Sequence, residues 1–192
     1  MKVLVMRHGQ SMDDVNNQYG GWTDLDLSLK GREQIKEKAK KIKALGPNFE
    51  KILTSPFKRA FQSAEILALE LGLSIDTFEY LKERNSYGVL SGMEKDRARE
   101  LYPDQVQKLE SEEYVDGSER YEDLVLRVKK SLELLREKGF ENVVLVTHGN
   151  YMKCLFGIFG KTITKKEDGS FVLVEIENGQ LEIILADGIE FT

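Results

Sequence analysis

The chain contains only two histidines, and both stand in the same local context, after a run of apolar residues and before a glycine. His8 follows the apolar run 3–6, with Arg7 between them, and His148 follows the run 143–147. Apolar runs of this length are typical of buried strands in a parallel sheet, whose carboxyl ends meet at one rim. We therefore expect both imidazoles at the rim where α/β sheets bind ligands.

A third segment adds positive charge to the same rim. Residues 51–54 predict a short strand, and Ser55-Pro56 then opens a helix with Arg59 in its first turn. A helix N-terminus that carries an arginine is a ready site for an anion. A histidine after a strand is usually structural, and an arginine at a helix start is usually a solvated surface residue. Two histidines in one context make a pocket for phosphate or carboxylate the better hypothesis.

Length and composition set the frame for this pocket. A chain of 192 residues predicts one domain, and its net charge of −5 argues against a general nucleic-acid surface. Cys154 is the only cysteine, so an internal disulfide is excluded and a reducing compartment, the cytoplasm, is expected. No stretch approaches the length of a membrane span, and we expect no membrane partner. An apolar edge on the C-terminal hairpin is compatible with a homodimer.

The other elements alternate between helix and strand. The predicted elements are an amphipathic helix over 31–45 with Ser28 as N-cap, a strand over 75–81, a helix from a Ser118 cap to Gly139, an apolar helix over 151–159 and a hairpin over 171–185. This order predicts an α/β fold, a three-layer α/β/α sandwich with a mostly parallel central sheet. Residues 86–117 are expected to form a lid-like insertion over the site within a single domain, 1–192.

Several separated motifs occur along nearly the whole chain. They are Arg7-His8-Gly9, Gly21-Trp22, Ser55-Pro56 with Arg59, Glu83-Arg84 and Thr147-His148-Gly149. In this order they resemble the histidine phosphatase superfamily, and more narrowly its cofactor-dependent phosphoglycerate mutase-like branch. The glycine after the second histidine favours that branch over the acid-phosphatase branch, and the resemblance implies a phosphoglycerate mutase-like fold.

The resemblance implies a role for each residue of the pocket. His8, kept neutral, attacks phosphorus and becomes a phosphohistidine, while Arg7, Arg59 and a protonated His148 hold the phosphoryl oxygens. Glu83 protonates the departing oxygen and later takes a proton from the attacking water. No metal and no cofactor is expected. Residues expected to bind the rest of the substrate are Gln10, Ser11, Asn17, Gly149, Tyr87 and Lys95.

The chain departs from the family pattern on the substrate side. Asp14 stands where the family often has an asparagine that donates to phosphate, so we expect it to turn away or Asn16 or Asn17 to substitute. Gly20 stands where the mutases have threonine or serine, and 85–86 provides two residues where they usually have one. The substrate side therefore differs more from the family than the phosphoryl side does.

Three functions are compatible with these residues. Tyr87 and Lys95 favour a bisphosphoglycerate-dependent phosphoglycerate mutase, but residues 104–119 carry many acids where mutases carry an arginine pair. We therefore predict a metal-independent phosphomonoester phosphatase that acts through a phosphohistidine on a small phosphorylated metabolite with little further negative charge. The mutase is the alternative, and a non-catalytic module that binds phosphate esters is the second. Binding alone would not need the acid Glu83.

Overall fold

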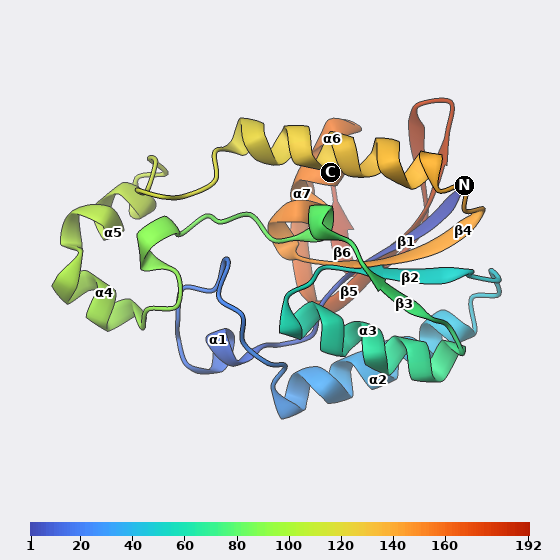
Figure 1. Ribbon diagram of the computed structural model, residues 1–192, viewed down its shortest axis with the longest axis horizontal. Helices are drawn as coiled ribbons and strands as arrows, with labels where there is room; N and C mark the ends of the chain where they lie inside the picture. Colours follow the sequence, from blue (N-terminus) through green and yellow to red (C-terminus); the bar gives the residue numbers. More distant parts are fainter.

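A computed structural model describes residues 1–192 and confirms the three-layer α/β/α sandwich (Figure 1). Its sheet has six strands in the order β3-β2-β4-β1-β5-β6. The strands are β1 (Lys2–Arg7), β2 (Lys51–Thr54), β3 (Ile75–Thr77), β4 (Asn142–Thr147), β5 (Ile163–Glu177) and β6 (Gln180–Phe191). The first four are parallel, whereas β5 pairs antiparallel with β1, and β6 with β5. The sheet is therefore mostly parallel, as the sequence predicts.

Helices cover both faces of the sheet (Figure 1). The helices α2 (Leu29–Lys43) and α3 (Lys58–Leu71) pack on one face, and α6 (Tyr121–Glu137) and α7 (Gly149–Ile158) pack on the other. Alternate residues of β1 contribute to the two cores. Val3 and Val5 join the cluster with α6 and α7, while Leu4 and Met6 join the cluster with α2 and α3. Because a strand buried on both faces needs apolar residues throughout, the run 3–6 is continuous.

Local signals account for several element boundaries. The Ser28 side chain accepts a hydrogen bond from the Gly31 amide and begins α2, as its position predicts. Asn178 and Gly179 have φ values of 50° and 78°, which suit the type I′ turn expected between β5 and β6. The strands of this hairpin are longer than the predicted 171–185.

Two sequence-based boundaries are wrong. The cap of α6 is Arg120 rather than Ser118, because the chain at Ser118 belongs to the turn in which its amide donates to the Val115 carbonyl. The strand expected over 75–81 ends at Thr77, and the short 3₁₀ helix η1 (Glu79–Leu81) follows. The Phe78 amide still donates to the Thr54 carbonyl, so this helix begins at the edge of the sheet.

The insertion projects beyond the carboxyl ends of the parallel strands, at the left of Figure 1. It contains η2 (Gly88–Leu90), α4 (Lys95–Leu101) and α5 (Pro103–Glu110). Its own core is a cluster of five buried residues, namely Tyr19, Leu90, Ala98, Val106 and Val115. Tyr19 comes from the loop that follows β1 and the single-turn helix α1 (Met12–Val15). The insertion is therefore packed onto the segment that follows His8.

The outer surface bears on two further expectations. None of the helices combines the length and the apolar character that crossing a lipid bilayer requires. At one edge of the sheet, β6 exposes Ile184 and Leu185. Pairing of two chains through this edge stays a prediction.

Candidate active site

The two histidines lie side by side at the carboxyl ends of neighbouring strands. In the register of β1 and β4, Arg7 lies opposite Thr147, and the His8 amide donates to the Thr147 carbonyl at 3.1 Å. The imidazole rings of His8 and His148 have centroids 4.9 Å apart and meet edge to face. Both are buried. Two segments that are distant in the sequence therefore deliver one pair of rings.

His8 is held as a neutral imidazole with one nitrogen left to react. Its Nδ1 lies 2.7 Å from the Gly9 carbonyl oxygen. Since a carbonyl only accepts, Nδ1 must carry the proton, which leaves the lone pair on Nε2. Nε2 accepts a hydrogen bond from Arg59 Nε at 3.2 Å. Burial, followed by the charges of Arg59 and Arg7, holds the pKa of His8 well below its usual value. His8 therefore has the charge state and orientation of a nucleophile.

His148 has a lowered pKa in the structure, whereas the family resemblance implies a protonated ring during the reaction. Its Nε2 lies 2.8 Å from Ser55 Oγ, while its Nδ1 is buried without a hydrogen-bond partner. Burial, then Arg59 and His8, lower the pKa of His148 well below its usual value. Protonation of His148 while it holds the phosphoryl oxygens stays a prediction. No carboxylate contacts the ring, so nothing offsets the free-energy cost of burying a charged imidazole.

Arg59 is fixed by a loop from another part of the chain. It lies in the first turn of α3 and is 2% exposed. One terminal nitrogen donates to the Gly21 carbonyl at 2.8 Å and the other donates to the Thr23 carbonyl. The guanidinium also lies 5.1 Å from the centre of the Phe57 ring. These contacts orient Arg59 so that its Nε faces His8.

Arg7 has a partner that the sequence does not reveal. Its Nη1 forms an ion pair with Asp168 of β5 at 2.9 Å, whereas its Nε is buried without a partner. Burial raises the pKa of Asp168, and the Arg7 charge opposes that rise. Asp168 has no motif around it, because only the pairing of β5 with β1 brings it to the site. It is a positioning residue that sequence reasoning missed.

The Glu83 carboxylate lies at the N-terminus of α7. Its Oε1 accepts hydrogen bonds from the backbone amides of Arg84 at 2.8 Å, Asn150 at 3.1 Å and Tyr151 at 3.3 Å. The first amides of a helix have no partner within the helix and carry partial positive charge, so they suit a carboxylate. The helix that follows His148 therefore also positions Glu83.

Two side chains hold the Glu83 backbone from outside. Trp22 Nε1 donates to the Glu83 carbonyl at 2.8 Å, and an Arg127 terminal nitrogen donates to the same oxygen at 3.2 Å. Arg127 also donates to the carbonyls of Tyr80 and Lys82. Arg127 lies within the periodic helix α6, where nothing in the sequence separates it from surface arginines. Sequence reasoning therefore missed this second positioning residue.

A cavity of about 160 Å³ opens over His8. Its lining comprises Arg7, His8, Asp13, Asp14, Gln18, Gly20, Gly21, Arg59, Glu83, Tyr87, Lys95 and Asn150. The structure thus brings Arg7, His8, Arg59 and Glu83 together with Tyr87 and Lys95 of the insertion segment, whereas His148 lies behind His8 and does not line the cavity. Asn150 was not among the expected site residues, although its position directly after His148-Gly149 indicates that it lies near the site. Asp13 and Gly20 had no assigned role.

Four of the expected substrate-binding residues do not line this cavity. Gln10 Oε1 accepts a hydrogen bond from Ser28 Oγ, and Ser11 Oγ donates to the Asp14 carboxylate. Asn17 is exposed in a turn with a φ of 51°, and its carbonyl accepts the Lys95 amide. The Cα of Gly149 is covered by the side chain of Lys166. These four residues support the loops around the site.

Asp14 lines the cavity and also accepts hydrogen bonds from Ser11. Its Oδ2 accepts a hydrogen bond from the Ser11 amide at 3.1 Å and another from Ser11 Oγ. Neither Asn16 nor Asn17 lines the cavity, so neither substitutes for the asparagine of the family pattern.

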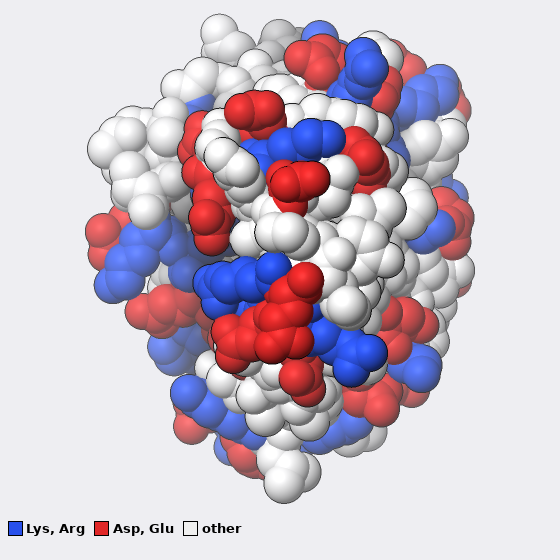
Figure 2. Space-filling view, turned by 90° about the vertical axis from the view of Figure 1, so that its left-hand side faces the viewer, with Lys and Arg blue, Asp and Glu red and all other residues white.

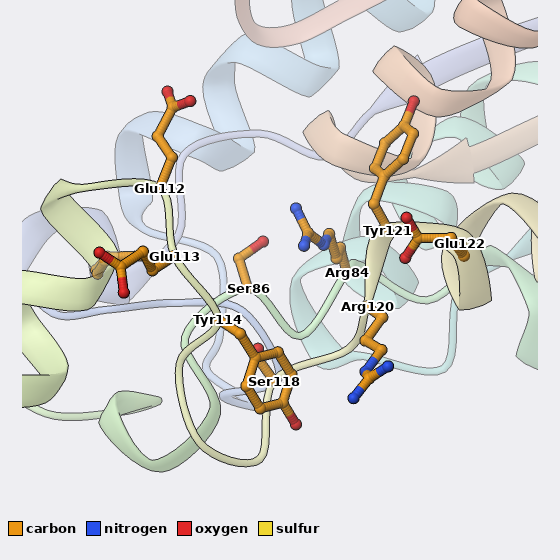
Figure 3. Close-up of a pocket in the computed structure, with 10 residues that line it drawn as sticks. Arg84, Ser86, Glu112, Glu113, Tyr114, Ser118, Arg120, Tyr121 and Glu122 are labelled. Carbon is orange, nitrogen blue, oxygen red and sulfur yellow. The ribbon is translucent and has the colours of Figure 1, made fainter.

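A second, larger cavity of about 750 Å³ lies between the end of the insertion and the start of α6 (Figure 3). Arg84 lies between Ser86 and Tyr121, with its guanidinium 5.8 Å from the centre of the Tyr121 ring, and Tyr114 and Arg120 also line the cavity. None of the catalytic candidates lines this cavity. Glu83 lines the cavity over His8, whereas the next residue, Arg84, lines this larger cavity.

The fold and the histidine pair together define a phosphoryl-transfer domain of the α/β class. The chain belongs to the histidine phosphatase superfamily, branch 1, whose family model matches residues 3–188. Members of this superfamily are phosphatases or mutases. The phosphoglycerate mutase-like resemblance is thereby confirmed.

Individual relatives agree with this assignment. The chain is 32% identical over 163 residues to a 2,3-bisphosphoglycerate-dependent phosphoglycerate mutase of Parvibaculum lavamentivorans, covering 80% of this chain and 77% of the relative. Among solved structures, Bacillus stearothermophilus YhfR superposes with a TM-score of 0.82 at 22% identity, covering 96% of this chain and 95% of the other. The alpha-ribazole phosphatase from Shigella flexneri superposes with a TM-score of 0.83 at 16% identity, covering 97% and 96%. These two structures show the shared fold.

Proposed function

We propose that this protein is a metal-independent phosphatase that hydrolyses small phosphomonoesters through a phosphohistidine on His8. The observation that carries the proposal is the neutral His8, whose unprotonated Nε2 lies beside Arg59. A nitrogen nucleophile requires this state, and the guanidinium beside it supplies the positive charge that a metal would otherwise provide.

The first step forms a bond between His8 Nε2 and phosphorus. Arg59 Nε and the free Arg7 Nε hold the phosphoryl oxygens, and the negative charge of the incoming group favours proton uptake by His148. The bond from phosphorus to the ester oxygen breaks, and that oxygen takes a proton from Glu83. The product alcohol then leaves.

The second step returns His8 to its initial state. A water molecule attacks phosphorus and gives a proton to the Glu83 carboxylate, while the P–N bond breaks and its electron pair returns to His8 Nε2. The amides of Asn150 and Tyr151 hold Oε1 of Glu83, so the same carboxyl group is in place for both proton transfers.

The mutase remains the second candidate. The Parvibaculum lavamentivorans relative bears that name, and Tyr87 and Lys95 line the cavity, which favours it. A mutase must also bind a second acidic group, yet the cavity carries Asp13 and Asp14 beside Glu83. These acids favour the phosphatase.

The surface around the insertion supports a small-molecule substrate. Figure 2 shows Lys and Arg side chains interspersed with Asp and Glu over the end of the molecule that carries α4 and α5. Nucleic-acid binding would need a continuous basic face. This mixed surface supports the expectation that neither a nucleic acid nor another polyanion is the partner.

The test is hydrolysis of 4-nitrophenyl phosphate in the presence of excess EDTA, comparing the wild type with His8→Ala. We expect activity that survives the chelator and falls by at least about 10³-fold in the variant. Quenching with alkaline detergent during turnover of ³²P-labelled ester should yield an alkali-stable, acid-labile labelled protein only in the wild type. Activity that persists without His8 would disprove the proposal. Transfer of phosphate between glycerate positions that exceeds hydrolysis, with 2,3-bisphosphoglycerate present, would establish the mutase.

A further inference from the structure

Asp13 is a buried acid that lines the catalytic cavity and has one carboxylate oxygen without a hydrogen-bond partner. The residue is 8% exposed and lines the cavity together with His8 and Arg59. Its Oδ1 has no hydrogen-bond partner, although buried polar atoms are nearly always paired. Arg7 Nε is a second such atom in a residue that lines the same cavity. A single ligand that accepts from Arg7 and donates to Asp13 would satisfy both.

We propose that Asp13 selects phosphate esters whose leaving group carries a hydroxyl or ammonium donor and no second anionic group. This inference rests on the proposed phosphatase function and assigns the specificity of the same site to a residue outside the phosphoryl-binding set.

Gly20 is the counterpart of Asp13. A Cβ atom at position 20 would lie 2.1 Å from Asp13 Oδ2 and 3.2 Å from its carboxyl carbon. The carboxylate therefore occupies the space that any larger residue at this position would need. The Asp13 carboxylate can adopt this position because residue 20 is a glycine and has no side chain.

The two arginines of the cavity bind groups other than Asp13. Arg59 donates to His8 and to the carbonyls of Gly21 and Thr23, and Arg7 pairs with Asp168. No hydrogen bond joins Asp13 to either guanidinium. Asp13 is near enough to act on Arg59 through its charge, but its Oδ1 receives no hydrogen bond from the protein.

The acids and cations of the lining balance before substrate enters. Asp13, Asp14 and Glu83 line the cavity together with Arg7, Arg59 and Lys95. A phosphoryl group takes up the two arginines, so a second anion on the leaving group would meet Asp13 and Asp14 with Lys95 as the one remaining cation. A hydroxyl or ammonium in that position would instead donate to Asp13 Oδ1. Sites that hydrogen-bond a substrate group discriminate strongly against analogues that lack it.

The test compares two esters of one carbon skeleton, glycerol 3-phosphate and 3-phosphoglycerate, with 4-nitrophenyl phosphate as the ester without a donor. For the wild type, kcat/KM for glycerol 3-phosphate should exceed that for 3-phosphoglycerate by at least about 10²-fold. In Asp13→Asn, which keeps the shape but removes the charge, this ratio should fall by about tenfold or more. Hydrolysis of 4-nitrophenyl phosphate should fall by a smaller factor than that of glycerol 3-phosphate, because its leaving group has no donor for Asp13.

Three further variants separate the explanations. Gly20→Ala displaces the Asp13 carboxylate without removing it and should lower the same ratio, which guards against a folding defect in Asp13→Asn. Asp14→Asn removes an acid whose carboxylate is already bound by Ser11, so its ratio should move less. Asp104→Asn, on the exposed surface of the insertion, should match the wild type.

Each outcome decides the inference. Equal losses on all three esters in Asp13→Asn would mean that Asp13 acts only on Arg59, and would overturn it. A wild-type ratio near one, or an Asp14→Asn effect equal to that of Asp13→Asn, would also overturn it. A wild type that hydrolyses no ester would instead disprove the phosphatase function on which the inference rests, and is recognised by the 4-nitrophenyl phosphate arm.

Discussion

The two ends of the catalytic cavity are built in different ways. At the phosphoryl end, His8, Arg59 and His148 are each at most 5% exposed and follow directly on strands of the sheet or on the turn after one. At the leaving-group end, Tyr87 and Lys95 come from an insertion whose core holds only five buried residues. The two cores of the sheet hold 21 and 15. Under the proposed function, the chemistry lies on the part with the large cores, and the discrimination lies on the part with a small core.

This difference teaches where variation is tolerated. A shift of the phosphoryl-binding groups would affect every ester, because all esters share the phosphoryl group. A shift of the insertion or of the loop around Asp13 would change only the contacts with the leaving group. Variants at the two ends should therefore produce different kinetic patterns.

Among variants that keep His8, the largest effect is expected at Arg59. Arg59→Lys keeps the charge but loses the Nε–H donor toward His8 and the two donors to the Gly21 and Thr23 carbonyls. We expect kcat/KM to fall by about 10²- to 10³-fold, the usual loss for one transition-state donor, and equally for aryl and alkyl phosphates. Steady-state kinetics on both kinds of ester measure this. Arg99→Lys, on an exposed face of the insertion, is the matched control and should change little. A loss confined to one ester would contradict the division between the two ends.

Glu83 lies where the two ends meet, so its effect should depend on the leaving group. Glu83→Gln keeps an oxygen for the amides at the start of α7 but removes the acid. We expect a loss of about 10²-fold or more for glycerol 3-phosphate, whose alkoxide needs a proton, and less than about tenfold for 4-nitrophenyl phosphate. A plot of log kcat/KM against leaving-group pKa should steepen in the variant. An unchanged slope would show that Glu83 does not protonate the departing oxygen.

The phosphoryl end was also the part that sequence reasoning placed best. His8 and His148 follow apolar runs that form β1 and β4. These neighbouring strands are parallel, so both histidines lie at the same edge of the sheet. Arg59 follows a Ser-Pro helix start. Each signal is local, so each could be assigned without knowing the rest of the chain.

The leaving-group end could not be placed in the same way. Gln10 and Ser11 stand next to the motif of His8 yet bind Ser28 and Asp14 instead of the cavity. Asp168 reaches Arg7 only through the antiparallel pairing of β5. Irregular loops have no periodicity, so the direction of their side chains depends on tertiary contacts that the sequence does not display. The lowered pKa of His148 could not be predicted from the sequence, since burial is a property of the whole fold.

The buried histidine pair should also appear in the pH dependence of stability. Both pKa values are lowered in the folded state, so both rings bind protons only after unfolding when the pH falls below about 6.5. The unfolded state then binds more protons, and the free energy of unfolding falls as the pH decreases from about 7 to 5.5. The limiting slope is about 1.4 kcal/mol per pH unit for each histidine.

Urea denaturation at several pH values measures this slope. The chain has no other histidine, so His8→Asn should remove about half of it. A flat profile in the wild type would show that both rings can be protonated in the folded protein.

The smallest effect is expected in the insertion, where stability and function separate. Leu67 of α3 and Leu90 of η2 are both fully buried, but Leu90 belongs to the five-residue cluster. Leu67→Ala should lower the global free energy of unfolding by about 2–5 kcal/mol. Leu90→Ala should lower it by only about 1 kcal/mol and should instead speed amide hydrogen exchange within 95–110, because a small core opens as a local unit. Equal global losses would mean that the insertion unfolds only with the sheet, and that the leaving-group end is as rigid as the phosphoryl end.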